Sequence, residues 1–255
     1  PDAREIEALL PLVDWGGVEW NDHAIRLPRS GMEIDFGGIG KEYAADRAAA
    51  IAIAAGIAHG YVNLAGDVRV WGGRPEGAPW RVGIRHPRIE GETIGGIEIA
   101  DGAVATSGDY ERCFEVGGLR YCHILDATTG WPVQGWRSVS VAAPLCVVAG
   151  SGATVGMLLG DAAPAWLDAQ GVDWLGVDAA GHIRKPGLKA DPRVRGAFVG
   201  RPSGRHLPGL CGSAFRPTPS GTLWVGLQAD TFPKASDLTV ASRNRCPRHP
   251  SPSSS

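Results

Sequence analysis

Apolar residues near the start of the chain recur at helical spacing. Between residues 5 and 13 they are Ile6, Leu9, Leu10 and Val13, with acidic residues among them. This spacing of three and four residues predicts a short amphipathic helix. A β pair is expected next, around Val18 and Ile25.

The stretch 41–55 carries the clearest helix signal in the chain. It is rich in Ala, contains no Pro or Gly, and is followed directly by Gly56. Ala has the highest helix propensity, and Gly commonly occupies the position just past a helix end. We therefore predict a helix that stops at Gly56.

After this helix the pattern changes to short alternating runs, which are typical of β-strands. The runs are residues 61–64, 68–71, 80–84, 113–116, 119–124 and 139–142. Glycines separate them, and Gly117-Gly118 suits a tight two-residue hairpin. Two further helices are expected at about 147–159 and 163–169. Helices interleaved irregularly with hairpins predict an α+β fold of mixed, largely antiparallel sheets with packed helices.

Composition and charge exclude some partners. The chain has 255 residues, of which 44% are hydrophobic, enough to bury the core of one large domain or two small ones. The formal net charge is −2, with both signs interspersed, which gives no basic field for nucleic acid and no polybasic membrane patch. No run of eighteen apolar residues is present.

The first residues of the chain and its cysteines give further expectations. The first residues contain neither Met nor a signal-peptide core, so we expect the chain to begin within a longer protein. The five cysteines are odd in number and include no C-x-x-C pair. They support neither a full disulfide framework nor a zinc site, and they leave the redox compartment open.

Residues 35–41 place a carboxylate, three glycines and a lysine directly before the helix predicted at 41–55. Glycine lets the backbone approach a ligand closely, and the free N–H groups at a helix start favour anions. The segment is therefore a candidate phosphate site. It matches neither the phosphate-loop pattern nor the dinucleotide fingerprint, and an ordinary turn before a helix is the alternative.

Four more segments follow this one in a fixed order, and together they carry a family resemblance. The five are DFGGIGKEYAADR (35–47), VNLAGD (62–67), WRVGIRHP (80–87), ATSGDYER (105–112) and HILDATTG (123–130). The chain resembles the FAD:protein FMN transferases, the ApbE family. The resemblance implies an ApbE-like domain over residues 1–190 that lacks its N-terminal part.

The resemblance implies an Mg²⁺-dependent enzyme that transfers FMN from FAD to a Thr or Ser hydroxyl of a target protein through a phosphoester bond. It further implies a respiratory or redox protein as acceptor. The expected location is periplasmic or membrane-anchored on the extracytoplasmic side, through an anchor outside this chain. A cytoplasmic location is the alternative. Nucleic acid is not an expected partner.

The resemblance also assigns residues. It places Asp35 at FAD, the Gly38 carbonyl at the metal, and Lys41 at the cofactor phosphates. The remaining cofactor contacts are Asp67, Thr106, Ser107, Arg112, His123 and Ile124.

Alternatives remain for several of these residues. Asp35 could be a turn carboxylate, Asp67 part of an Asx turn between strands, and Arg112 a surface ion-pair residue. The Thr-Ser-Gly segment at 106–108 is expected to form a corner whose hydroxyls and free N–H groups bind phosphate.

His123 and Asp126 are the predicted catalytic pair. His123 would shuttle a proton or contact the ligand, and Asp126 would orient its imidazole or bind the cofactor. The alternative for His123 is a structural histidine. The reaction breaks a pyrophosphate, so the site needs cations to stabilise the charge that develops.

One position departs from the family pattern. Family members often have an Asp and, four residues later, a Thr that complete the metal site. Here Gly150 occupies the Asp position, while Thr154 keeps its hydroxyl on the same helix face. Mg²⁺ prefers carboxylate and phosphate oxygens, so we expect weaker metal binding or greater dependence on the ligand's own phosphates.

Two other functions are alternatives to flavin transfer, and residues 191–255 need a separate prediction. Water could replace the acceptor hydroxyl, which would make the protein an FAD pyrophosphatase that releases FMN and AMP. Gly150 and the missing N-terminal part favour a non-catalytic flavin-binding module. Residues 191–255 are rich in Pro, Ser, Gly and Arg without a sustained period, and are expected to be a disordered or non-native tail.

Overall fold

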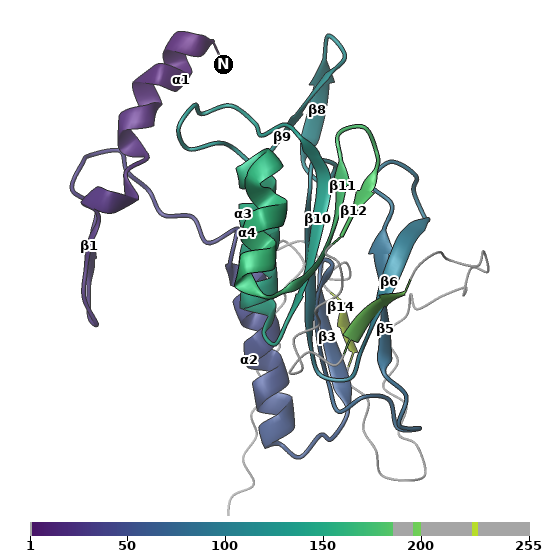
Figure 1. Cartoon of the computed structure of the whole chain (residues 1–255). Coiled ribbons are helices and arrows are strands. Elements are labelled where there is room, and N and C mark those ends of the chain that lie inside the picture. Colours follow the sequence, from purple (N-terminus) through teal and green to yellow (C-terminus); the bar gives the residue numbers. More distant parts are fainter. Residues whose placement is uncertain (1, 186–195, 200–225, 229–255) are drawn as a thin grey trace, which may run out of the picture.

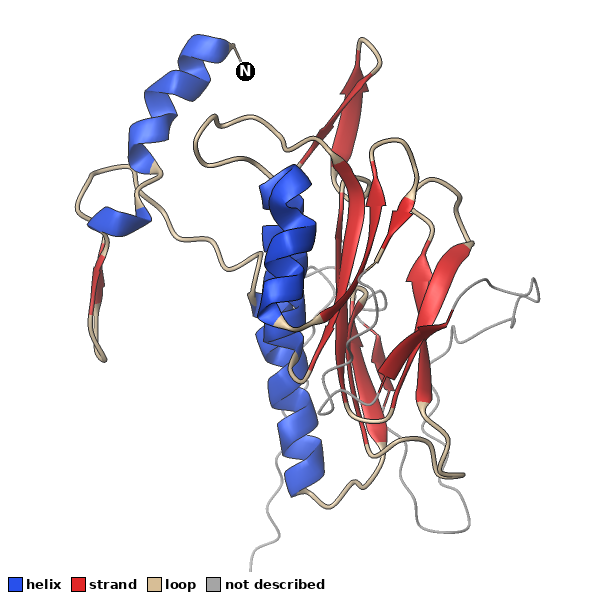
Figure 2. Ribbon diagram, viewed as in Figure 1, coloured by secondary structure: helices blue, strands red, loops and turns tan. Residues whose placement is uncertain are grey.

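The computed structural model describes residues 2–185, 196–199 and 226–228. A seven-stranded sheet forms the middle layer, with helices on one face and a three-stranded sheet on the other (Figure 1). Figure 2 shows the helices gathered on a single side of the strands. The prediction of an α+β fold with mixed, largely antiparallel sheets is confirmed.

The central sheet has the strand order β12-β11-β10-β7-β4-β3-β14. Neighbouring strands are antiparallel, except that β14 runs parallel to β3. The strands are β3 (Gly60–Leu64), β4 (Asp67–Trp71), β7 (Gly102–Gly108), β10 (Trp136–Ala143), β11 (Asp173–Asp178), β12 (Ile183–Arg184) and β14 (Gly226–Gln228).

The remaining strands form three smaller sheets. The three-stranded sheet has the order β13-β6-β5, from Gly196–Val199, Thr93–Ile99 and Trp80–Arg85. Two hairpins complete the set, β1 (Glu19–Trp20) with β2 (Ile25–Arg26), and β8 (Cys113–Val116) with β9 (Leu119–Cys122). The Gly117-Gly118 turn joins β8 to β9 with positive φ at both glycines, as predicted.

The helices are α1 (Ala3–Leu9), α2 (Gly40–Ala54), α3 (Cys146–Leu159) and α4 (Ala163–Gln170), with 3₁₀ turns at Leu10–Leu12, Trp15–Gly17 and Gly160–Ala162. Asp2 and Glu5 form a capping box at the start of α1. The predicted stop of α2 is confirmed, since Gly56 follows it with φ +84°.

Side chains alternate between the two faces of the central sheet, which creates two cores. Ala103 and Ala105 of β7 join the cluster under the helices, whereas Val104 joins the cluster against the three-stranded sheet. In β10, Val139 and Val141 face the helices in the same way, and Ala142 faces the opposite side. This alternation decides which polar side chains can reach a site on the helical face.

The segment Cys146–Gln170 is long and apolar enough to cross a membrane by length and composition alone. It comprises α3, a 3₁₀ turn and α4, and α3 packs on β7 and β10. Seven residues of α3 are buried, including Ala149, Ala153 and Met157. The structure therefore shows it as a core helix pair.

Some elements differ from the sequence prediction. The corner expected at Thr106 and Ser107 is wrong, because both residues lie inside β7 and pair with β10. The strands β6 and β11 were not predicted, and β9 ends at Cys122 rather than at residue 124. The tail predicted for 191–255 falls mostly outside the described residues, apart from β13 and β14, and stays a prediction.

Candidate active site

The segment before α2 forms a turn that fixes Asp35. The Asp35 carboxylate accepts a hydrogen bond from the Gly37 backbone N–H at 2.5 Å, and Gly40 N–H donates to the Phe36 carbonyl at 2.7 Å. Both Asp35 and Gly38 are exposed. Asp35 thus has the turn role that was the alternative to an FAD contact. The Gly38 carbonyl lies at the solvent-facing start of α2.

Lys41 and Asp67 form an ion pair at the start of α2. Lys41 Nζ lies 2.6 Å from Asp67 Oδ2, with the Asp67 side chain buried and the Lys41 side chain half-exposed. Burial lowers the pKa of Lys41, but the hydrogen bond and charge of Asp67 outweigh this, and the pKa lies above its ordinary value. Burial raises the pKa of Asp67 more than Lys41 lowers it. The pair holds a cation beside a buried carboxylate.

A second carboxylate of α2 ties this helix to α3. Asp46 accepts hydrogen bonds from the backbone N–H groups of Cys146 and Val147, at 2.8 and 3.0 Å. These are free donors at the start of α3, so Asp46 caps that helix from a distant part of the chain. The buried Arg69 lies 3.6 Å from Asp46 and 3.1 Å from Asp101.

The alternation along β7 separates the two predicted hydroxyls. Ser107 faces the helices, where its Oγ lies 3.0 Å from Thr154 Oγ1 on α3. Thr106 faces the other way, and its hydroxyl bonds to Ser140 Oγ at 2.8 Å. Only the Thr106 backbone N–H reaches the site, where it bonds to Asp67. The prediction that both hydroxyls bind one phosphate is therefore not supported for Thr106.

Glu42 is a buried acidic residue to which the sequence reasoning gave no role. It is 5% exposed, and its Oε2 has no hydrogen-bond partner among the described residues. A Cβ placed on Gly150 of α3 would lie 2.5 Å from Glu42 Cγ and 2.7 Å from Oε1. The Glu42 side chain thus fills the space that a side chain at position 150 would take.

His123 lies just past the end of β9 and is exposed. Burial of part of the ring lowers its pKa, and the charges of Arg112 and Lys41 lower it further. A hydrogen bond to the Arg112 backbone opposes these effects without cancelling them. The charge of Glu111 also raises the pKa of His123, but the net shift is downward, so the neutral form of His123 is favoured near pH 7.

The other two residues of the histidine segment have structural contacts. The Asp126 carboxylate accepts a hydrogen bond from Thr128 N–H at 2.7 Å, and no contact between Asp126 and His123 is seen in the described part of the chain. Ile124 is 8% exposed and packs in the core under the helices. The structure thus gives Asp126 a turn role and Ile124 a packing role, and their predicted cofactor contacts stay predictions.

Contacts and charge interactions link several of the predicted residues in one region. Lys41 contacts Asp67, Asp67 is bonded by the Thr106 backbone, and Lys41 acts electrostatically on His123. Ser107, which follows Thr106 in β7, contacts Thr154 of α3. The start of α2, the middle of α3, the start of β4 and the end of β7 therefore form a single candidate site.

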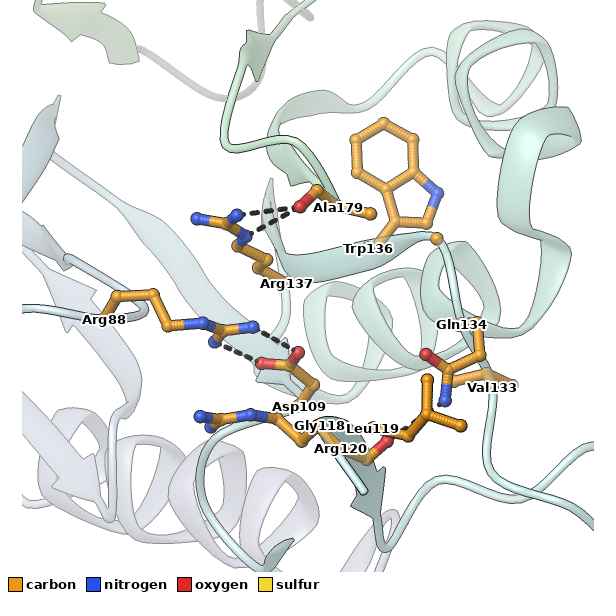
Figure 3. A pocket seen from close by; sticks show the side chains of 11 residues that line it. Arg88, Asp109, Gly118, Leu119, Arg120, Val133, Gln134, Trp136, Arg137 and Ala179 are labelled. Atoms are coloured by element: carbon orange, nitrogen blue, oxygen red, sulfur yellow. Dashed lines mark hydrogen bonds and ion pairs between the residues drawn. The ribbon is translucent and has the colours of Figure 1, made fainter. Parts of the chain in front are cut away.

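A cavity of about 190 Å³ is lined by other residues. Figure 3 shows its lining side chains from close by. Arg88 pairs with Asp109 there at 2.6 Å, and Arg137 donates to the Ala179 carbonyl at 2.8 Å. None of the predicted cofactor residues lines this cavity. Pockets for drug-sized ligands span roughly 300–1,000 Å³, so this one is too small for FAD.

Comparisons with known proteins identify the family of this chain. The model of the ApbE family matches residues 1–175. The FAD:protein FMN transferase of Vibrio cholerae is 37% identical over 146 residues, which cover 56% of this chain and 43% of the relative. The enzyme of the same name from Treponema pallidum is 34% identical over 148 residues, which cover 54% and 41%. The chain therefore aligns with less than half the length of these relatives.

Solved structures show the same likeness. The ApbE protein of Thermotoga maritima superposes with a TM-score of 0.65 at 36% identity, covering 73% of this chain and 62% of that one. The flavin transferase ApbE of Vibrio cholerae gives a TM-score of 0.64 at 27% identity, covering 73% and 60%. The chain thus has the fold of the flavin transferases. It belongs to the ApbE family, and the resemblance read from its motifs is confirmed.

Proposed function

We propose that this protein transfers the FMN part of FAD to a Thr or Ser hydroxyl of a target protein. The acceptor oxygen forms a bond to the FMN phosphorus, the pyrophosphate P–O bond breaks, and AMP leaves. Family membership supports this reaction, and the Lys41–Asp67 pair at the start of α2 is the structural observation that carries it.

Lys41 is the group that would hold a phosphate of FAD. Its side chain is half-exposed, so its ammonium can contact a ligand while Asp67 fixes its position. Its raised pKa keeps it charged at neutral pH. A cation at this position stabilises the negative charge that develops on the transferring phosphoryl group.

His123 is the group that would take the proton of the acceptor hydroxyl. Its lowered pKa leaves the imidazole neutral at pH 7, as a general base requires. Its exposure lets a hydroxyl of another protein approach. The proton moves from the acceptor oxygen to the imidazole as the new P–O bond forms.

Mg²⁺ is part of this proposal. When bound, it would neutralise charge on the diphosphate and assist the departure of AMP. In the described residues, no group of three His, Cys, Asp or Glu side chains suited to a metal is found. A cation held jointly by one carboxylate, a hydroxyl and substrate phosphates needs no such group, and the unpartnered Glu42 Oε2 fits this arrangement.

The acceptor and the location are also proposed, on family membership alone. The acceptor is a protein of a respiratory or redox system. The protein is periplasmic or anchored on the extracytoplasmic side of the membrane.

The test is mass spectrometry of Ser- and Thr-containing peptides after incubation with the protein, FAD and Mg²⁺. We expect some peptides to gain the mass of FMN less one water. Lys41→Met should abolish this gain, while Lys185→Met, at an exposed lysine, should keep it.

Two other outcomes would contradict the proposal. Release of FMN and AMP at the same rate with and without peptide would identify an FAD pyrophosphatase. Binding of FAD without its consumption would identify a flavin-binding module.

A further inference from the structure

The buried Glu42 carboxylate needs an explanation. An ionised carboxylate that is taken out of water without a partner is costly, so such groups are usually paired or bind metal. Glu42 is 5% exposed, and among the described residues its Oε2 accepts no hydrogen bond. The neighbouring Lys41 is already paired with Asp67 at 2.6 Å.

Among the described residues, the surroundings of Glu42 offer further oxygens, and no ion pair of Glu42 with a cation is found. Gly150, against which Glu42 packs, lies one turn before Thr154 on the same face of α3. The Thr154 hydroxyl meets Ser107 Oγ at 3.0 Å. A carboxylate and two hydroxyls thus lie along one face of α3.

The fit between Glu42 and Gly150 is specific. At 2.5 Å from Glu42 Cγ, even a Cβ at position 150 has no room in the present arrangement. A carboxylate on position 150 and the carboxylate of Glu42 would compete for one space. The contact between α2 and α3 therefore holds one buried carboxylate, and it comes from α2 instead of α3.

We propose that Glu42 is a metal-binding carboxylate of this protein and that it takes the place of the acidic residue absent at position 150. With the Thr154 hydroxyl it would hold a hard divalent cation that the FAD diphosphate also binds. This inference rests on the proposed function for the identity of the diphosphate, but its test does not depend on transfer activity.

The test measures Mn²⁺, as a substitute for Mg²⁺, by electron paramagnetic resonance in the presence of FAD. We expect Glu42→Gln to weaken Mn²⁺ binding at least tenfold, because the amide has the same shape but no charge. Glu76→Gln is the matched control, since the Glu76 side chain is 74% exposed on a loop. Equal Mn²⁺ affinity of wild type and Glu42→Gln would overturn the inference.

A charge relocation gives a second test. Gly150→Asp alone should destabilise the fold, because its side chain meets Glu42. The double variant Glu42→Ala with Gly150→Asp moves the carboxylate to α3 and should restore Mn²⁺ binding to within a few-fold of wild type. Failure of the double variant to bind Mn²⁺ while it is folded, as judged by circular dichroism, would count against a shared site.

The outcomes separate the inference from the proposed function. Loss of Mn²⁺ binding in Glu42→Gln supports the metal role even if no peptide becomes flavinylated. Peptide flavinylation that persists with unchanged Mn²⁺ affinity in Glu42→Gln supports the proposed function and overturns the metal role.

Discussion

The two faces of the central sheet are buried in different ways. The face toward β5 and β6 is covered mainly by apolar side chains, among them Ile84, Ile97 and Ile99, and the Thr106–Ser140 hydroxyl pair is also on this face. The face toward α2 and α3 is rich in Ala and also contains Val and Trp, and it buries Glu42, Asp67 and Arg69. The first face stabilises the fold mainly through apolar burial. The second face also buries charged groups, and their loss of hydration lowers its contribution to the free energy of unfolding.

Small residues make the charged face possible. Gly150, Gly152 and Gly156 line the side of α3 that meets α2 and the sheet, and a Cβ at either end of this row would crowd a neighbour. The close approach of the helices leaves room for only a few polar groups. Substitution of one of these polar groups should therefore change the site strongly and the stability of the fold modestly.

The largest expected effect on stability comes from the face toward β5 and β6. Ile97 is fully buried, so Ile97→Ala should lower the free energy of unfolding by about 3 kcal/mol through lost burial and a residual cavity. Urea unfolding measures this. Mn²⁺ affinity should stay at the wild-type value, and a change in both quantities would show that the two faces are not independent.

On the other face, His123→Gln should lower the transfer rate by about 10²–10⁴-fold with little change in unfolding free energy. Burial and the Arg112 charge lower the pKa of His123, so the neutral base persists below pH 6.5. The wild-type rate should therefore be flat near pH 7 and fall only as the pH drops through that lowered pKa. Rates measured from pH 5 to 8 test this, and an unchanged acid limb in the variant would exclude His123 as the base.

A smaller loss of stability is expected at the link between the helices. Asp46→Asn removes the charge that caps α3 and faces Arg69, which should cost about 1–2 kcal/mol. Thermal unfolding followed by circular dichroism measures it. Asp22→Asn, at an exposed position, is the control and should leave the unfolding temperature unchanged.

The smallest expected effect has the opposite sign. Without metal, Glu42→Gln should raise the free energy of unfolding by about 1 kcal/mol, because it removes an unpaired buried charge. Urea unfolding in a chelator measures this gain, and added Mg²⁺ with FAD should reverse the ranking. A loss of stability in chelator would mean that Glu42 has a structural partner.

The sequence predicted the fold where local patterns decide it. The Ala-rich run gave α2 to within a residue, and Gly117-Gly118 gave the β8–β9 hairpin, because helix propensity and turn chemistry are local properties. The strand β7 was missed because Thr106, Ser107 and Gly108 have the composition of a turn. Pairing with β4 and β10 on its two sides decides its structure.

The site was predictable in part for the same reason. Lys41 and Asp67, each chosen from a distinctive motif, form an ion pair in the structure, and their role at the cofactor stays a prediction. Glu42 was missed because an acidic residue in the first turn of a helix is usually solvated. Its burial depends on Gly150, which lies far away in the sequence and touches it only after α2 and α3 pack.

The contact between Glu42 and Gly150 constrains how this protein could have evolved. A lineage that moves the carboxylate from one helix to the other must pass through an intermediate with two acidic side chains in one space or with none. The first is crowded and the second loses its cation ligand, so neither substitution is neutral by itself. The two positions are therefore expected to change together among descendants, one acidic and the other glycine.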